Sequence, residues 1–176
     1  MIVVRVARLP QDSAAILALD TGFTTSTVFD VAATPNGFEL SERKLPTPIR
    51  KRFPIDDLEE RDRPWSHGFV AEAAGEIVGF AASSYEAWNR RLTLWHLYVA
   101  PAHRGRGVAR ALTDRIAALG LEVGAREIWL ETSNLNVAGV AAYRVLGFTF
   151  TGLDLTLYDG TPAEGEIALF FARPIE

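Results

Sequence analysis

The chain has 176 residues, of which 48% are hydrophobic and 23% charged, and its formal net charge is −4 at pH 7. This length and balance predict a single globular domain with a sizeable core. The sequence contains no cysteine, which excludes disulfides, thiolate zinc sites and a thiol nucleophile. Its three scattered histidines indicate no metal site.

The charge is unevenly placed along the chain. Residues 150–176 carry one basic group and five acidic ones, and the basic footprint of a nucleic-acid-binding protein is missing. No apolar run approaches the length of a membrane span, and residues 1–8 lack the layout of a signal peptide. We therefore expect a cytoplasmic protein that binds neither nucleic acid nor membranes.

Strand-like patterns dominate the first 64 residues. The elements expected here are a strand over 2–8, a short helix from Asp12 and Ser13 to about Asp20, strands over Phe23–Val31 and Phe38–Leu45, and a helical turn or loop over Asp56–Arg63. The sequence Pro35-Asn36-Gly37 is typical of a turn that joins the two middle strands. We expect Pro46 and Pro48 to end the second of these strands.

From residue 65 onward, strands come first and then alternate with helices. The predicted strands are His67–Ala73, Glu76–Tyr85, Arg91–Val99, Arg126–Thr132, Phe148–Tyr158 and Glu166–Ala172. A helix over about Gly105–Leu119 and a second over Val137–Leu146, which stops at Gly147, separate the later strands. This order predicts an α/β or α+β domain in which helices pack on a mixed sheet.

The segment before the first long helix has the composition of a phosphate-binding loop. It reads Leu97-Tyr-Val-Ala-Pro-Ala-His-Arg-Gly-Arg-Gly-Val-Ala-Arg110. Its two glycines let backbone N–H groups converge at a helix N-terminus, where unpaired donors and the helix dipole favour a pyrophosphate. Arg104 and Arg106 can add charge-assisted contacts. Arg110 replaces the third glycine of the dinucleotide-binding fingerprint, and the Gly-Lys-Ser/Thr of a P-loop occurs nowhere in the chain.

The pattern Leu97-x-Val99-x-Pro101-x-x-Arg104-Gly-x-Gly-x-Ala109 resembles the acetyl-CoA loop of the GCN5-related N-acetyltransferase (GNAT) superfamily. The later strand–helix–strand of that superfamily is matched by Glu131-Thr-x-x-x-Asn136, Tyr143 and Gly147-Phe148. The likeness covers about residues 66–172. More loosely, the chain resembles the streptothricin acetyltransferases at Trp88-Asn89-Arg90, Glu131-Thr132 and Leu157-Tyr158.

The resemblance implies a mixed, mostly antiparallel central sheet flanked by helices, with acetyl-CoA bound at a splay between two central strands. It also implies one N-acetyltransferase domain over residues 1–176, with a variable acceptor-side part at 1–64 and a cofactor-binding core at 65–176. The residues implied to bind the cofactor are Leu97, Tyr98, Val99, Arg104, Gly105, Arg106, Gly107, Val108, Ala109, Asn136 and Tyr143. Asn136 equally suits a helix cap.

Direct acetyl transfer from a thioester to an amine needs a proton donor and a base. The resemblance places Tyr143 as the general acid for the leaving thiolate, and the alternative is a tyrosine that packs in the core. Related enzymes commonly carry Glu or Asp where this chain has Trp95 and His96. His96 is therefore one candidate base, and Glu131 on the neighbouring strand is the second. The further acidic candidates are Asp154 and Glu86.

Regular strand alternation places His96 on the same face as Leu94 and Tyr98, with Trp95 on the opposite face. Only one side chain of the Trp95/His96 pair is then expected to point into the acceptor site. The aromatic residues suited either to wall an ammonium site or simply to fill the core are Tyr85, Trp65 and Trp88.

The expected function is the metal-free, acetyl-CoA-dependent N-acetylation of a primary amine on a small molecule. A streptothricin-like antibiotic or a polyamine is the expected acceptor. One alternative is an acetyltransferase for peptide or protein N-termini. Another is a non-catalytic CoA-binding module, motivated by the missing carboxylate at Trp95 and His96. A homodimer that exchanges C-terminal strands is also compatible with the sequence.

Overall fold

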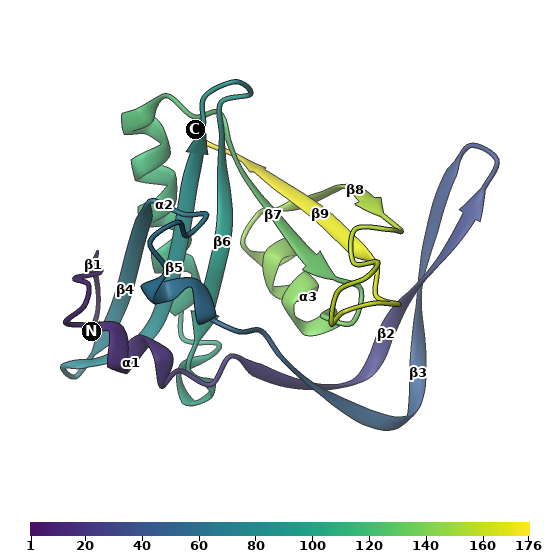
Figure 1. Cartoon of the computed structure of the whole chain (residues 1–176), viewed down its shortest axis with the longest axis horizontal. Helices are drawn as coiled ribbons and strands as arrows, with labels where there is room; N and C mark the ends of the chain where they lie inside the picture. Colours follow the sequence, from purple (N-terminus) through teal and green to yellow (C-terminus); the bar gives the residue numbers. More distant parts are fainter. The chain divides into compact units, whose positions relative to one another are not determined.

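The computed structural model describes residues 1–176 and contains two compact units. The first unit comprises Met1–Gly22, Arg52–Leu130 and Arg173–Glu176, and the second comprises Phe23–Lys51 and Glu131–Ala172. Mostly antiparallel strands with few helices build the fold (Figure 1), so the predicted mixed α/β class is confirmed. None of the helices is long and apolar enough to cross a membrane. The single-domain organisation stays a prediction.

The first unit contains strands in the order β1-β4-β5-β6-β7. These strands are β1 (Ile2–Val6), β4 (His67–Ala73), β5 (Glu76–Glu86), β6 (Arg91–Val99) and the start of β7 (Glu127–Ser133). The helical elements are α1 (Ser13–Leu17), α2 (Val108–Val123) and the 3-10 turns η1 (Asp56–Glu59) and η2 (Pro101–His103). Strands β4, β5 and β6 run side by side in Figure 1, each antiparallel to the next, whereas β6 and β7 are parallel.

Apolar side chains on both faces of β5 form the core of the first unit. On one face, Leu112 of α2 is fully buried, and Gly79 lets this helix approach closely: a Cβ at Gly79 would lie 2.9 Å from Val108 Cγ1. On the other face, Phe80 packs with Trp65. Burying one such large side chain contributes about 1.5–3 kcal/mol. The neighbouring strand β6, which carries His96 and Leu97–Val99, is therefore firmly held.

A β-bulge in β6 changes which side chains share a face. The consecutive residues Ala82 and Ser83 of β5 pair with His96 and Leu94, so Trp95 is the extra residue. Directly opposite residues of an antiparallel pair share a face. His96 therefore lies on the opposite face from Leu94. The prediction from regular alternation was wrong, because the bulge shifts the period by one residue.

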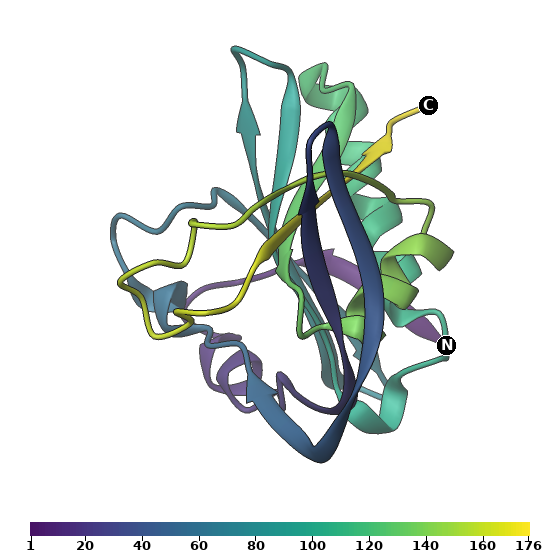
Figure 2. The same cartoon turned by 90° about the vertical axis from the view of Figure 1, so that its right-hand side faces the viewer.

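The second unit combines a two-stranded ribbon with strands in the order β7-β9-β8. The ribbon consists of β2 (Gly22–Thr34) and β3 (Gly37–Arg52), which Figure 2 shows side by side. The other elements are α3 (Val137–Val145), β8 (Thr149–Asp154) and β9 (Ala168–Pro174). Asn134, just after β7, links β2 to the segment that precedes β9 within this unit. Its side-chain N–H donates to Phe29 O (2.8 Å), and its side-chain oxygen accepts from the Ile167 N–H (2.9 Å).

Two prolines lie within β3 and do not end it, contrary to the prediction. The strand runs through Pro46 and Pro48 to Arg52 because it is an edge strand whose partner is β2. Residues two apart in a strand point their N–H groups to the same edge. Both missing donors can therefore fall on the unpaired side, where proline is tolerated.

Two further boundaries differ from their predicted positions. Helix α2 begins at Val108 and continues through Gly120, where a Cβ would lie 2.3 Å from Ile175 Cδ1. Glycine is thus a packing requirement at this position and not a stop. Strand β8 ends at Asp154, whose carboxylate accepts a hydrogen bond from the Thr156 N–H (2.7 Å) and so stabilises a turn. As a result, Tyr158 lies in the loop that follows.

Candidate active site

The predicted cofactor loop has the backbone geometry of an anion cradle. Gly105 and Gly107 have φ values of +71° and +83°, which glycine adopts without strain. Gly107 directly precedes α2, and no side chain caps this helix N-terminus. The first N–H groups of α2, beginning at Val108 and Ala109, are therefore donors for an anion. A pyrophosphate fits this arrangement.

The two arginines of the loop have different environments. Arg104 donates from Nε to the Val99 carbonyl (3.0 Å) and from Nη2 to the Gly22 carbonyl (3.0 Å). Its side chain thus braces the loop against the end of β6 and the start of β2. Arg106 is exposed. The contacts of both arginines with phosphate stay predictions.

The parallel ladder between β6 and β7 is short. It joins Arg91–Thr93 to Glu127–Trp129 and then stops, so Leu97–Val99 lies beyond it. Backbone groups outside a ladder can bind an extended ligand. The predicted alignment of the pantetheine by Leu97, Tyr98 and Val99 is compatible with this geometry, although the Val99 carbonyl already accepts from Arg104.

His96, the first candidate base, is enclosed within the first unit and only 9% exposed. Its Nε2 lies 2.9 Å from both carboxylate oxygens of Asp57, and its Nδ1 lies 3.3 Å from the Tyr98 hydroxyl oxygen. The indole N–H of Trp65 donates to the same carboxylate (2.9 Å), and Phe80 packs against the imidazole. A carboxylate only accepts, so Nε2 carries a hydrogen that it donates to Asp57, and Nδ1 faces the Tyr98 hydroxyl.

Tyr143 of α3 is half-buried against aromatic residues of the second unit. Its ring centroid lies 6.0 Å from that of Phe148 and 6.1 Å from that of Phe171. Burial raises the pKa of Tyr143 to about 12, and the negative charge of Glu131 acts in the same direction. The phenol is therefore protonated at neutral pH, as a proton donor to a thiolate must be.

Thr132 links Tyr143 to Asn136. The side-chain N–H of Asn136 donates to Thr132 Oγ1 (2.9 Å), and the Thr132 side chain in turn interacts with the Tyr143 hydroxyl, which lowers the pKa of Tyr143 against the effect of burial. Asn136 also caps α3, because its Oδ1 accepts from the Gly139 N–H (3.0 Å). The predicted cap is confirmed, and the contact of Asn136 with the pantetheine stays a prediction.

Glu131 of β7 lies in a polar group of side chains that we call the Glu131 cluster: Lys51, Glu131, Ser133, Tyr158 and Glu166. The Tyr158 hydroxyl donates to Glu131 Oε1. Lys51 forms an ion pair with Glu166, and the Ser133 hydroxyl donates to the same carboxylate. Burial raises the pKa of Glu131 and the charge of Glu166 adds to this, whereas Tyr158 and Lys51 oppose it. A carboxylate with raised proton affinity suits a general base.

The other predicted side chains have less suitable contacts. Trp65 is 3% exposed and belongs to the core, whereas Trp88 is 85% exposed. The indole N–H of Trp95 donates to Ser84 (2.9 Å), which lies on the same face of β5 as Ala82. Trp95 therefore shares a face with His96. The prediction that it lies opposite was wrong because Trp95 is the extra residue of the β-bulge. The remaining acidic candidates, Asp154 and Glu86, accept hydrogen bonds from Thr156 and Ser84.

Sequence reasoning missed several residues that the fold brings to these sites. Asp57 is 39 positions from His96, and Lys51 is 115 positions from Glu166. Tyr158 was expected within a strand. No periodic pattern signals contacts across such separations, because periodicity reports the face of one element only.

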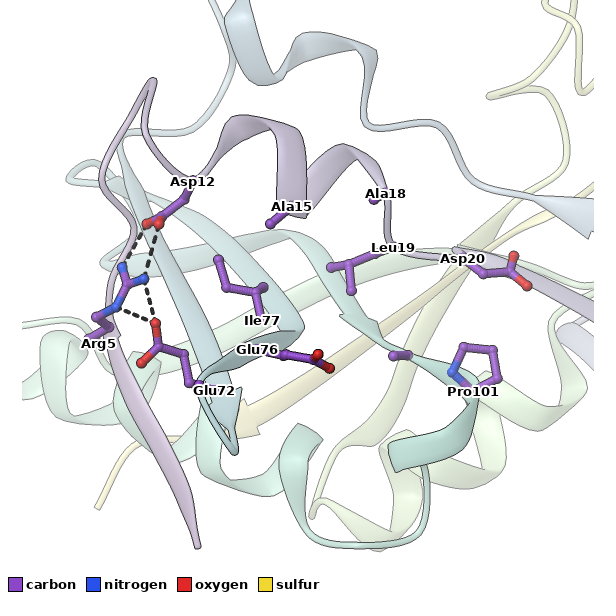
Figure 3. A pocket seen from close by; sticks show the side chains of 12 residues that line it. Arg5, Asp12, Ala15, Ala18, Leu19, Asp20, Glu72, Glu76, Ile77 and Pro101 are labelled. Carbon is purple, nitrogen blue, oxygen red and sulfur yellow. Dashed lines mark hydrogen bonds and ion pairs between the residues drawn. The ribbon is translucent and has the colours of Figure 1, made fainter.

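A separate cavity of about 620 Å³ lies beside α1 in the first unit (Figure 3). At one end Arg5 bridges Asp12 and Glu72, at 2.6 Å from each, and the Arg5 guanidinium holds the pKa of Asp12 below its ordinary value. Asp12 precedes α1 but makes no side-chain cap, because Arg5 occupies its carboxylate. Leu19 and Ile77 line the middle of the cavity. None of the predicted catalytic or cofactor-binding residues lines it.

Comparison with known proteins decides the family. A model described as the Acetyltransferase (GNAT) family matches residues 36–148. The chain belongs to the GNAT family of acetyltransferases. This confirms the resemblance and the N-acetyltransferase activity predicted from the Leu97–Arg110 segment and Tyr143.

The relatives extend the match to nearly the whole chain. A streptothricin acetyltransferase of Streptomyces lavendulae is 47% identical, over 94% of this chain and 91% of its own. One of Escherichia coli is 32% identical, over 95% and 94%. The crystal structure of nourseothricin acetyltransferase has a TM-score of 0.88 at 45% identity and covers 99% of each chain. A Bacillus anthracis protein in complex with acetyl coenzyme A, at TM-score 0.83 and 21% identity, covers 100% and 99% and shows the same fold.

Proposed function

We propose that this GNAT enzyme transfers the acetyl group of acetyl-CoA to a primary amine of a streptothricin-type antibiotic. The observation that carries the acceptor assignment is the length of the match to the streptothricin acetyltransferases. The GNAT model begins at residue 36, whereas the similarity at 47% identity extends over 94% of the chain. The likeness therefore includes the N-terminal part, which the resemblance assigns to the acceptor side.

The donor assignment rests on the loop at the start of α2. The positive φ of Gly105 and Gly107 and the uncapped N–H groups at Val108 and Ala109 form a cradle for the CoA pyrophosphate. Arg104 holds this loop in place through backbone carbonyls. When bound there, acetyl-CoA supplies the activated acetyl group as a thioester.

Glu131 is the base that we propose for the reaction, in preference to His96. The His96 Nε2–H is engaged by Asp57 and its Nδ1 faces Tyr98. Glu131 has one oxygen bound by Tyr158, and Oε2 has no hydrogen-bonding partner within the protein. An amine with a pKa of about 10.4 arrives as an ammonium ion, so a base must take one proton before the nitrogen can attack and a second as the C–N bond forms.

Two side chains, Glu131 and Tyr143, account for the protons that move during the acetyl transfer. The ammonium ion first loses one proton through Glu131 to solvent. The neutral amine nitrogen then attacks the thioester carbonyl, the new C–N bond forms, and Glu131 takes the second proton that the nitrogen loses. The C–S bond breaks, and the CoA thiolate takes the proton of Tyr143, whose pKa of about 12 keeps the phenol protonated at neutral pH. Proton return from Glu131 to Tyr143 through solvent restores the enzyme.

The experiment uses purified protein, acetyl-CoA and a panel of acceptors: nourseothricin, a polyamine, free lysine and N-terminal peptides. Release of CoA is followed with a thiol reagent, to which the protein adds no background because it has no cysteine. Mass spectrometry of the acceptor identifies the product. We expect acetylation of the antibiotic at the highest kcat/KM. Acetylation of peptides alone, or CoA binding without any transfer, would contradict the proposal.

The homodimer and the cytoplasmic location stay predictions.

A further inference from the structure

Glu131 is held by residues from distant parts of the second unit. Tyr158, in the loop after β8, donates its hydroxyl to Oε1. This bond fixes one carboxylate oxygen and leaves Oε2 without a partner in the protein. A carboxylate held in this way has a defined orientation, because rotation about its last bonds would break the hydrogen bond.

Lys51, near the end of β3, supplies the positive charge of the cluster. Its ammonium pairs with Glu166, and the two side chains are only 17% and 16% exposed. Glu166 also accepts from the Ser133 hydroxyl. With Glu131 and Glu166 ionised and Lys51 protonated, the cluster has a net charge of −1. One acceptor ammonium neutralises this charge.

We propose that Tyr158 and Lys51 are positioning residues of the acetyl transfer: Tyr158 orients Glu131 toward the acceptor amine, and Lys51 pairs with Glu166, which Ser133 holds two residues along the same face of β7 from Glu131. This inference rests on the proposed role of Glu131 as the base. It adds two residues that act through Glu131 and its neighbour Glu166.

The electrostatic contributions agree with this geometry. Burial is the largest cause that raises the pKa of Glu131, and Glu166 adds to it. The Tyr158 hydrogen bond and the Lys51 charge both lower it. From α3, Tyr143 faces the same carboxylate as a neutral group. Removal of either Tyr158 or Lys51 therefore leaves only one of the two groups that favour the ionised form, against burial and Glu166.

The two residues are distinguishable because only one of them is charged. At low pH, kcat/KM falls as Glu131 becomes protonated, and we call this part of the pH profile the acid limb. In Tyr158→Phe and in Lys51→Met, the acid limb moves to higher pH, by about one unit. Above that limb, Tyr158→Phe leaves the charge of the cluster unchanged, so KM for a cationic acceptor stays near the wild-type value. Lys51→Met makes the cluster more negative, so KM falls.

The experiment is a pH profile of kcat/KM with nourseothricin for the wild type, Tyr158→Phe, Lys51→Met and Lys51→Arg. Lys51→Arg keeps the charge and is expected to keep the acid limb in place. Lys44→Met is the matched control, because Lys44 is the other lysine of β3 and is exposed. Its profile is expected to match that of the wild type.

A second variant covers the case in which Lys51→Met fails to fold with Glu166 unpaired. Lys51→Met combined with Glu166→Gln removes one charge of each sign. Because these two charges act on Glu131 in opposite directions, the acid limb of the double variant is expected to return toward the wild-type position.

Failure of this inference is separable from failure of the proposed function. Wild-type protein that transfers no acetyl group to the antibiotic would overturn the proposed function. Full activity in Glu131→Gln would overturn the role of Glu131 as the base. If Glu131→Gln is inactive but the acid limb is unmoved in Tyr158→Phe and Lys51→Met, the positioning roles alone are wrong.

Discussion

His96 in the first unit and Glu131 in the second are both titratable side chains on strands, each bound to a residue far away in the sequence. The His96 imidazole has its Nε2–H on Asp57 and its Nδ1 facing Tyr98, and it is 9% exposed. Glu131 has one oxygen on Tyr158 and the other without a partner in the protein. A group with all its atoms engaged stabilises the fold, whereas a group with one open acceptor can take a proton.

The largest expected effect is that of Glu131→Gln, which tests the comparison most directly. Glutamine keeps the volume and can still accept from Tyr158, but it takes no proton at neutral pH. We expect kcat to fall by about 10²–10³-fold, measured as CoA release with saturating substrates. Unchanged thermal unfolding shows that the loss is chemical. If the kcat of Glu131→Gln stays within about twofold of the wild-type value, Glu131 is not the base.

Tyr143→Phe is expected to lower kcat by about 10²-fold while the CoA dissociation constant stays nearly unchanged. The reason is that the phenol proton is lost but the ring still packs on Phe148 and Phe171. Calorimetric titration with CoA and steady-state turnover separate the two quantities. Thr132→Val keeps the phenol of Tyr143 and removes the Thr132 hydroxyl, which also accepts from Asn136, so its effect on kcat is expected to be smaller. Loss of CoA binding with turnover per complex retained would make Tyr143 a structural residue.

Gly107→Val tests the cofactor cradle of the first unit. A β-branched residue at φ +83° is strained by about 1–3 kcal/mol, so the loop changes its backbone and CoA binds about tenfold more weakly or worse. Gly75→Val is the matched control, because Gly75 has φ +84° in the β4–β5 turn with open space around it. An unchanged dissociation constant in Gly107→Val would refute the cradle.

His96→Phe is expected to have the smallest effect on turnover and to act on stability instead. It leaves the Asp57 carboxylate with Trp65 as its remaining donor, which lowers the free energy of unfolding by about 1–3 kcal/mol. Urea unfolding measures this loss. His67→Phe is the control, since the His67 ring contacts the neighbouring Ser66. A loss of kcat as large as that of Glu131→Gln, with stability unchanged, would reverse the comparison and make His96 the base.

Much of the fold follows from local patterns. The strands His67–Ala73 and Arg91–Val99 have the predicted bounds, and β2 and β3 meet at the predicted Pro35-Asn36-Gly37 turn. The failures have tertiary causes. Pro46 and Pro48 are accepted because β3 lies at an edge, Gly120 stays helical because Ile175 packs on it, and the bulge at Trp95 overrides alternation.

By itself, the sequence predicted the two-glycine loop before α2 and the capping role of Asn136. Both depend on contiguous residues, namely the glycines at positive φ before α2 and the asparagine before α3. Only the tertiary structure decided which candidate base has an open oxygen. The Glu131 cluster brings together residues 51, 131, 133, 158 and 166. Asp57 contacts His96 although the two residues are 39 positions apart in the sequence. Such contacts follow from how elements pack against one another, and the periodicity of a single element contains no record of them.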